Sequence, residues 1–410
     1  MRILFIVPYV PNLIRVRPYN LIRHLAGHGH QVTVVTLWSN DAERACLTDL
    51  QKHTEKVISA RMPRWRSIWN SISALPSRTP LQAVYSWQPS LARLIEQEVS
   101  HCNGKQGYDV IHVEHLRGAQ YGLFLKTIPG APPVVWDSVD SISHLFRQAI
   151  QRSKSFFGRS VTRLELGRTE RYEPYLVRQF NHITVTSPQD KQAFLELLPD
   201  PSPHAPITIL PNGVDLEYFQ PNSDLLREPG TIVISGKMSY HANVTMVLFL
   251  LQDIMPLVWV RKPEARVLVV GKDPGREILS YASDPRVTVT GTVDHLPPYL
   301  QKATVAVAPI AYGAGIQNKV LEAMACETPV VVSPLAINAL SVRQGQELLV
   351  ASGAEEFAAS ILSLLDDADK CREIGKAGRR YVERNHHWPV TAVRLGEIYR
   401  SVLSERSGDT

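Results

Sequence analysis

Two kinds of segment alternate along the chain when its hydrophobic and polar positions are followed in order. Short apolar runs, typical of strands buried on both faces, are separated by longer segments with apolar residues at helical spacing. In the first half the predicted strands are Ile3–Val7, Gln31–Thr36, Val110–Val113, Val134–Asp137 and His182–Thr186. Strands that alternate with helices predict an α/β protein with parallel sheets and crossover helices.

The turn between the first predicted strand and the helix after it indicates whether the chain binds a dinucleotide. Leu21, Ile22 and Leu25 share one face of a helix predicted over Arg17–Gly27, and glycines then end it. A dinucleotide-binding protein would carry a GxGxxG turn before this helix. The turn after Val7 contains no glycine, which argues against a nicotinamide or flavin dehydrogenase.

Residues 199–206 form the clearest break in the chain, with four prolines in eight residues. Because proline cannot continue a helix or a central strand, we expect an interdomain linker there. A second series of strands follows: Ile207–Leu210, Thr231–Ser235, Arg266–Val270, Arg286–Thr290, Val305–Pro309 and Val330–Ser333. The helices predicted with them are Val244–Val260, Lys319–Ala325, Ala354–Leu365, Lys370–Arg384 and Val390–Leu403.

Length and composition fit a two-domain globular protein. A chain of 410 residues exceeds one ordinary hydrophobic core, so we expect domains at 1–200 and 201–385, with 386–410 as a separate terminal helix. No apolar stretch is long enough for a membrane span, and the N-terminus is predicted as a strand, not as a secretory signal. The four scattered cysteines fit reduced thiols in a cytoplasm.

The net charge of +5 is unevenly distributed. Residues 1–200 hold 24 Lys and Arg against 16 Asp and Glu, which leaves residues 201–410 with a slight acidic excess. No nucleic-acid-binding motif accompanies the basic half, so an anionic membrane face or a phosphorylated acceptor fits better than nucleic acid. The segment Arg61–Trp69 interleaves arginines with tryptophans, a composition suited to a membrane interface or to a solvated basic face.

The residues with the most evident chemistry lie between Pro309 and Val332. The predicted strand Val305–Pro309 is followed by a loop that contains Gly313-Ala314-Gly315 and then by the helix Lys319–Ala325. Glycines let a ligand approach the backbone, and a helix N-terminus with Lys319 would attract an anion. Glu322, one turn later, could accept hydrogen bonds from two hydroxyls. Taken alone, the same residues could form a tight turn and a surface ion pair.

Further motifs make the interpretation specific. They are Leu210-Pro-Asn-Gly-Val-Asp215, Ser235-Gly-Lys-Met-Ser-Tyr-His-Ala-Asn-Val244, Val269-Val-Gly-Lys-Asp-Pro274, Val289-Thr-Gly-Thr-Val-Asp294 and Lys319-Val-Leu-Glu-Ala-Met-Ala325. In this order they resemble the GT-B glycosyltransferases of family 4, a retaining group. The resemblance covers essentially the whole chain and implies two Rossmann-like domains facing each other across a cleft. It also implies that the last helix returns to the first domain.

The resemblance assigns a donor site to the second domain. Glu322 corresponds to the family glutamate that binds the ribose, Lys237 to its phosphate-binding arginine, and Lys319 would add a second positive charge. The donor residues it implies are Gly236, Lys237, Asn243, Val293, Gly315, Ile316, Gln317, Asn318, Lys319 and Glu322. Two family side chains are missing, since Ala314 replaces a glutamate and Ala242 a lysine.

The resemblance assigns less to the first domain. Val139 or Asp140 corresponds to a family histidine near the reacting sugar, and Asp140 is the candidate, although a helix N-cap is an alternative role for it. His144 is a second candidate there. Arg15 and Arg17, after the first strand, would bind donor phosphate or acceptor, or would be ordinary surface arginines. With Lys237 and Lys319, Asp140 completes the predicted catalytic set.

The function implied is a hexosyltransferase that works with retention and without a metal, which agrees with the lack of a DxD motif at a strand end. The expected donor is UDP-glucose or another UDP-hexose, with GDP-mannose second. The expected acceptor is a glycan or a lipid-linked hydroxyl in polysaccharide, lipopolysaccharide or glycolipid synthesis, at the cytoplasmic face of the membrane. A non-catalytic nucleotide-binding partner subunit, a GT-B epimerase and a nucleic-acid-binding protein are the alternatives.

Overall fold

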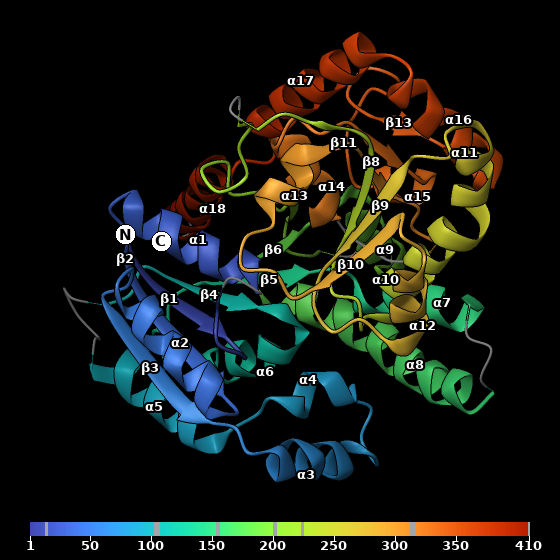
Figure 1. Cartoon of the computed structure of the whole chain (residues 1–410). Helices are drawn as coiled ribbons and strands as arrows, with labels where there is room; N and C mark the ends of the chain where they lie inside the picture. The colour runs from blue at the N-terminus through green and yellow to red at the C-terminus, as the bar shows by residue number, and fades with distance from the viewer. Residues whose placement is uncertain are drawn as a thin grey trace. The chain divides into compact units, whose positions relative to one another are not determined.

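The computed structural model describes residues 1–12, 15–101, 107–152, 156–199, 203–222, 225–311 and 317–408. The chain divides into two compact units. The first consists of Met1–Pro211 together with Trp388–Thr410, and the second of Asn212–His387. Each unit contains its own parallel sheet with helices packed against it (Figure 1).

The first unit is built on seven parallel strands in the order β3-β2-β1-β4-β5-β6-β7. Their bounds are β1 Arg2–Val7, β2 Gln31–Trp38, β3 Lys56–Arg61, β4 Val110–Glu114, β5 Val134–Val139, β6 His182–Val185 and β7 Ile207–Ile209. This order reverses direction between β1 and β4, as in Rossmann folds, where ligands bind at the carboxyl ends of the strands beside that switch point.

Helices cover both faces of this sheet. They are α1 Val16–Gly27, α2 Asp41–Gln51, α3 Arg64–Ala74, α4 Leu81–Tyr85, α5 Pro89–His101, α6 His115–Leu125, α7 Ile142–Arg152, α8 Phe156–Gln179, α9 Pro188–Leu197 and α18 Trp388–Gly408. The residues of β1 show why the strand is apolar throughout. Leu4 and Ile6 belong to the core on one face, whereas Ile3, Phe5 and Val7 belong to the core on the other. A strand buried on both faces cannot alternate apolar with polar residues.

The last helix, α18, is an integral part of the first unit. It lies beside α1 (Figure 1), and Trp388, Leu395 and Tyr399 are buried in the same core as Leu21 and Leu25. The core on this face of the sheet is therefore completed by residues from the two ends of the chain.

The second unit repeats the same plan with six parallel strands in the order β10-β9-β8-β11-β12-β13. Their bounds are β8 Glu228–Ser235, β9 Arg266–Val270, β10 Val287–Gly291, β11 Ala303–Ala308, β12 Val330–Val332 and β13 Leu349–Val350. The helices include α10 His241–Phe249, α11 Met255–Arg261, α12 Arg276–Leu279, α13 Pro297–Lys302, α14 Asn318–Ala325, α15 Pro334–Ile337, α16 Gly353–Leu365 and α17 Ala368–Asn385. The switch point of this sheet lies between β8 and β11.

One helical segment of the second unit differs from the sequence-based expectation about membrane spans. Residues His241–Arg261 form a continuous helix, with one π-turn at Leu250–Ile254, that is long and apolar enough to cross a membrane by length and composition. Its inner face, with Met246, Leu250 and Val258, is buried in the core of the second unit. The segment is thus the crossover helix between β8 and β9.

The expected domain boundary at residue 200 was wrong by one strand. β7, expected to open the second domain, pairs in parallel with β6 through Ile183 and Ile207. Leu210 is also buried in the first unit. The proline-rich segment therefore connects α9 to β7 within one unit, and the chain passes between the units at Pro211 and again at His387. The prolines do mark a break in secondary structure. The pairing of β7 with β6, however, places the strand after that break in the first unit.

Candidate active site

The loop that follows β8 is held in place by backbone contacts to the neighbouring strand. The Gly236 N–H donates to the Val270 carbonyl over 3.1 Å, and the Met238 N–H donates to the Lys272 carbonyl over 2.9 Å. Gly236 and Gly271 adopt φ values of 152° and 149°. A Cβ on Gly271 would lie 1.7 Å from the Gly236 carbonyl oxygen, so this approach of two backbones requires glycine at Gly271.

Asn243 connects this loop to the helix that follows β11. Its Nδ2 donates to the Lys237 carbonyl over 3.0 Å. Its Oδ1 accepts a hydrogen bond of 2.6 Å from Lys319 Nζ. Asn243 is only 7% exposed, so both bonds are shielded from water. The amide therefore fixes the loop after β8 and the first turn of α14 relative to each other, at the switch point of the second sheet.

Helix α14 begins at Asn318 and buries Val320, Leu321 and Met324 against the sheet. Gln317, at the N-cap, makes no side-chain capping bond to the helix. The first amides of a helix have no intrahelical acceptor, and the positive end of its dipole favours an anion. Asn318 Oδ1 is buried and has no hydrogen-bond partner among the described residues. Of the predicted donor residues, Gly315 and Ile316 lie outside the described part of the chain.

Lys319 and Glu322 lie on the open side of α14, and both are half-buried. Burial lowers the pKa of Lys319 to about 8, although the charge of Glu322 opposes this shift. Burial raises the pKa of Glu322 to about 7, against the opposing effect of Lys319. The pair is thus not an ordinary surface ion pair, because the surrounding protein disfavours both charges until a ligand compensates for them.

Two further predicted donor residues, Lys237 and Val293, have side chains outside the contact between Asn243 and Lys319. Lys237 is exposed, although its carbonyl is held by Asn243. Val293, in the loop after β10, is half-buried against the core of the second unit. The structure therefore directly joins Asn243, Lys237 and Lys319, whereas no contact joins Val293 to them among the described residues.

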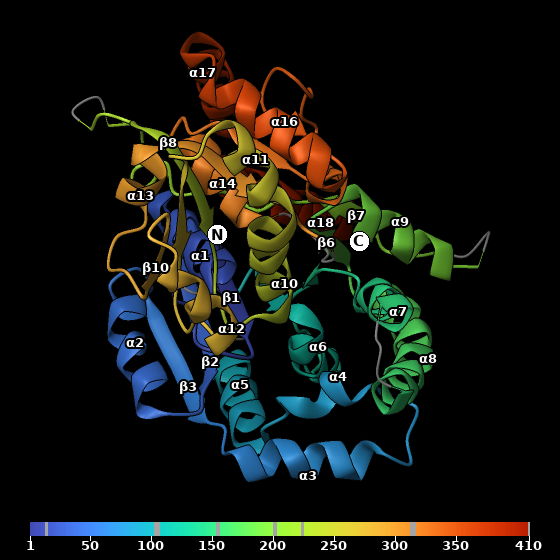
Figure 2. The same ribbon diagram turned by 45° about the vertical axis from the view of Figure 1, so that its right-hand side comes forward.

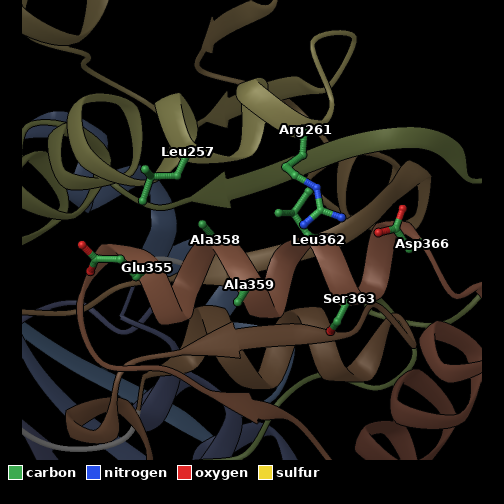
Figure 3. Close-up of a pocket in the computed structure, with 8 residues that line it drawn as sticks. All are labelled: Leu257, Arg261, Glu355, Ala358, Ala359, Leu362, Ser363 and Asp366. Carbon is green, nitrogen blue, oxygen red and sulfur yellow. The ribbon is translucent and has the colours of Figure 1, made fainter.

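An open hollow on the second unit lies away from these residues. It measures ≈ 430 Å³ and lies between α11 and α16. Figure 3 shows Leu257 and Arg261 on one helix facing Ala358, Ala359 and Leu362 on the other. None of the predicted donor residues lines it, and its walls are the outer surfaces of two helices. The described donor candidates Lys237, Asn243 and Lys319 lie instead at the carboxyl ends of β8 and β11.

In the first unit, Arg17 is not a surface arginine. Its guanidinium pairs with Asp137 through Nε to Oδ2 at 2.8 Å and Nη2 to Oδ1 at 3.1 Å. The side chains of Arg17 and Asp137 are 5% and 0% exposed. Arg15, by contrast, is partly exposed, stacks over Tyr9 and donates to Glu43 over 3.1 Å. The two arginines that were predicted together therefore have different environments.

Asp140 and His144 lie near the start of α7. The helix begins at Ile142, and the His144 N–H donates to Ser141 Oγ, so the N-cap role considered for Asp140 belongs to Ser141. Asp140 Oδ1 instead accepts from Thr186 over 3.3 Å. Burial and the nearby Asp190 raise the pKa of Asp140 to about 6. The His144 ring bonds to Gln148 Nε2 on the same helix over 2.8 Å, and among the described contacts none joins His144 to Asp140.

A polar group that was not predicted from the sequence lies at the switch point of the first sheet. Tyr9, after β1, donates to Glu114 at the end of β4 over 2.7 Å. Burial raises the pKa of Glu114 to about 8. His112 stacks on Phe5 and bonds to the Tyr399 hydroxyl over 2.9 Å. The available signal was a histidine and a glutamate in an otherwise apolar strand, Val110–Glu114.

Comparison with known proteins agrees with this geometry. The family model for group 1 glycosyl transferases matches residues 229–367, and the model for glycosyltransferase family 4 matches residues 15–218. Together these two models cover most of both units.

Individual relatives are more distant. A GDP-mannose-dependent alpha-(1-6)-phosphatidylinositol monomannoside mannosyltransferase of Mycobacterium tuberculosis is 28% identical over 223 residues, which is 48% of this chain and 57% of that protein. A D-inositol 3-phosphate glycosyltransferase of Thermobispora bispora is 23% identical over 336 residues, 72% of this chain and 71% of that protein. The first of these matches thus spans little more than half the length of the relative.

Solved structures match over almost the whole chain. Sucrose-phosphate synthase from Thermosynechococcus elongatus superposes with a TM-score of 0.70 at 20% identity and covers 98% of this chain and 99% of that one. HepE of Anabaena, solved in complex with UDP-glucose, gives a TM-score of 0.69 at 15% identity and covers 98% and 100%. At these identities the likeness establishes the GT-B fold alone. With two family models, a shared fold and donor-type residues at the switch point of the second sheet, the chain belongs to the GT-B glycosyltransferases of family 4, group 1.

Proposed function

We propose that this protein transfers a hexosyl group from a nucleoside-diphosphate sugar to a hydroxyl acceptor, and that the unit Asn212–His387 holds the donor. The observation that carries the proposal is the bond from Lys319 to Asn243, which brings a cation and a helix N-terminus to the switch point of a Rossmann-like sheet. A diphosphate is the part of the donor that this arrangement fits.

The chemistry follows from the charges that the site holds before a ligand binds. The bond between sugar and diphosphate breaks with negative charge accumulating on the departing phosphate. Lys319, the first amides of α14 and the exposed Lys237 supply fixed positive potential for that charge. Glu322, one turn further along α14, is suited to accept hydrogen bonds from the two ribose hydroxyls. We propose retention at the anomeric carbon and a reaction without a metal as parts of the same hypothesis.

The donor base is proposed as uracil or guanine. The expectation of a UDP-hexose from the sequence agrees with HepE, whose complex contains UDP-glucose, at 15% identity. The relative from Mycobacterium tuberculosis is by its name GDP-mannose-dependent, at 28% identity over 48% of this chain. These names make UDP-glucose and GDP-mannose the first two donors to test, with a glycan or a lipid-linked hydroxyl as acceptor.

Thermal unfolding in the presence of UDP, GDP, ADP and dTDP tests the donor site first. A nucleotide present at about a hundred times its Kd stabilises the folded state by about 2.7 kcal/mol, which is readily measured as a shift in Tm. Turnover of the matching nucleotide sugar then tests transfer, and NMR of the product gives its anomeric configuration. If no nucleotide raises Tm, the donor site is wrong.

A nucleotide that raises Tm without any turnover would favour the alternative of a non-catalytic subunit. That alternative is motivated by Ala314 and by Ala242 in the first turn of α10, which replace a family glutamate and a family lysine. Release of the sugar with inversion, or its epimerisation, would contradict the proposed reaction and leave the donor site intact.

A further inference from the structure

Helix α3 of the first unit exposes a continuous apolar face. Five large apolar residues are more than half exposed: Trp65 64%, Ile68 59%, Trp69 60%, Ile72 53% and Leu75 52%. They are spaced at three and four residues, so they form one stripe along the helix. Single exposed apolar residues are ordinary on protein surfaces, but a contiguous stripe with two tryptophans marks an interaction surface.

The orientation of α3 keeps this stripe outside. Its inner face is small and polar, with Ser67, Asn70 and Ala74 buried. Asn70 Nδ2 donates to the carbonyls of Val84 and Trp87, over 3.1 and 2.8 Å. Turning the helix to bury its tryptophans would break both bonds. The two bonds from Asn70 therefore fix the orientation of α3 that leaves the stripe exposed.

Neighbouring elements extend the apolar surface. Arg168 of α8 donates to the Leu75 carbonyl over 2.6 Å, which ties the end of α3 to the middle of α8. One turn earlier on α8, Leu164 is 55% exposed. Helix α4 packs beside α3 (Figure 2). Its residue Tyr85 is 42% exposed.

The charged side chains of the segment that contains α3 and α4 are all positive. Residues 61–88, which contain α3 and α4, hold four arginines (Arg61, Arg64, Arg66 and Arg78) and no aspartate or glutamate. Arg61, Arg64 and Arg78 are exposed, as is Arg163 on α8. An uncharged groove on a protein partner, or the same α3 face of a second copy, would match the apolar stripe but would leave the acid-free, arginine-rich border without opposite charge. An anionic lipid surface matches both.

We propose that α3 docks the first unit on a lipid bilayer that contains anionic headgroups. The helix would lie in the plane of the interface, because 11 residues extend only about 16 Å, which is far short of a membrane span. Trp65 and Trp69 would enter the boundary between headgroups and acyl chains, and the arginines would contact lipid phosphates. This inference goes beyond the proposed function and does not depend on it.

Sedimentation with vesicles tests the proposal directly. The full-length protein is mixed with vesicles of phosphatidylcholine alone or with about 30 mol % phosphatidylglycerol, and the bound fraction is measured against lipid concentration. The wild type is expected to bind the anionic vesicles at least about 10-fold more tightly than the neutral ones. The double variant Trp65→Ser/Trp69→Ser and the double variant Arg64→Glu/Arg78→Glu are each expected to lose at least about 10-fold in affinity for them.

A matched control uses apolar residues of the second unit that are at least as exposed as the two tryptophans. Leu226 and Val260 are 85% and 79% exposed, so Leu226→Ser/Val260→Ser removes comparable surface away from α3 and should bind vesicles as the wild type does. Each variant should keep the wild-type Tm and nucleotide response, which separates lipid binding from the donor site.

Three results would overturn the proposal. In the first, the wild type does not bind anionic vesicles. In the second, the α3 variants bind these vesicles as tightly as the wild type does. In the third, the α3 substitutions change the oligomeric state of the protein and leave vesicle binding unchanged. The last result would identify a second copy of the chain as the occupant of the stripe.

Discussion

Lys319 Nζ donates a hydrogen bond of 2.6 Å to Asn243 Oδ1, which joins two residues 76 positions apart in the sequence. Asn243 also holds the Lys237 carbonyl through its Nδ2. One buried amide thus sets the position of an ammonium group and the path of the loop that carries a second lysine. The candidate site consequently depends on a residue that need not touch the donor itself.

Replacing Lys319 by methionine should abolish most nucleotide binding. The change removes the charge from α14 but keeps the length of the side chain, and a hydrogen bond to a charged group contributes about 1.5–3 kcal/mol, or roughly 10- to 100-fold in affinity. Asn243→Ala keeps the charge but releases it, so a smaller loss of about 10-fold is expected. Isothermal titration with the nucleoside diphosphate that stabilises the protein measures both changes.

A lysine outside the site provides the control for these variants. Lys376 is exposed on α17, in the same unit, and Lys376→Met should bind nucleotide as the wild type does. Equal affinities for Lys319→Met and Lys376→Met would remove Lys319 from the donor site.

The Lys319–Glu322 pair predicts a bell-shaped pH dependence of kcat/KM for the donor. The pKa of Glu322 is raised to about 7, so its carboxylate is protonated and binds the ribose less well as the pH falls through that value. The pKa of Lys319 is lowered to about 8, so its charge is lost as the pH rises through that value. The maximum is therefore expected between these two values, because kcat/KM reports groups of the free enzyme.

Single substitutions assign the two limbs of this profile. Glu322→Gln should remove the acid limb, because the amide accepts a hydrogen bond without titrating. Lys319→Arg should remove the alkaline limb, because a guanidinium stays protonated throughout. The measurement uses a nucleotide sugar, whose diphosphate is a diester and does not titrate in this range. Limbs that persist in both variants would assign the profile to other groups.

Gly271→Ala should distort the donor loop and destabilise the second unit. The new methyl group would lie 1.7 Å from the Gly236 carbonyl oxygen, at a φ of 149° that a side chain rarely adopts. A combined steric and backbone penalty of about 2–4 kcal/mol is expected, seen as a lower Tm together with weaker nucleotide binding. Gly275→Ala is the control, since nothing lies within 4 Å of its Cβ position. If the two variants melted alike, the close approach at Gly271 would have no structural importance.

The sequence predicted the architecture well because local pattern and fold agree in a doubly wound protein. Strands buried on both faces appear as apolar runs, so Ile3–Val7 and Thr231–Ser235 fall within β1 and β8. β3 was missed because its residues, Lys56–Arg61, are half-buried or exposed at the edge of the sheet. β7 was recognised as a strand but assigned to the wrong domain, since a three-residue segment carries no information about its pairing partner.

Only those parts of the candidate site whose residues lie close together in the sequence could be predicted from it. Lys319 and Glu322 share one turn of a helix, so their spacing made them candidates, and the neighbouring motifs made the interpretation specific. The bond to Asn243 and the pairing of Arg17 with Asp137 join residues 76 and 120 positions apart, so only the folded chain reveals them. Arg17 and Arg15 are neighbours in sequence with the same chemistry, and no local pattern says that one is buried and the other partly exposed.

The Arg17–Asp137 pair gives the final prediction, which concerns the stability of the first unit. Arg17→Met would leave the Asp137 carboxylate uncompensated in a site that is 0% exposed, with His112 Nε2 3.8 Å away as the nearest group of opposite charge when protonated. Breaking a buried pair in this way costs about 3–5 kcal/mol, whereas replacing both partners by apolar residues of similar volume is often close to neutral.

The double variant Arg17→Met/Asp137→Leu should therefore unfold at a higher urea concentration than Arg17→Met. The exposed pair Lys52–Asp49, with side chains 67% and 47% exposed, is the matched comparison, and Lys52→Met should change stability by less than about 1 kcal/mol. Urea unfolding monitored by circular dichroism measures all three variants. A double variant less stable than the single one would mean that contacts of Asp137 outside the pair, such as the 3.2 Å bond that its Oδ1 accepts from the Val139 N–H, contribute more than the pairing itself.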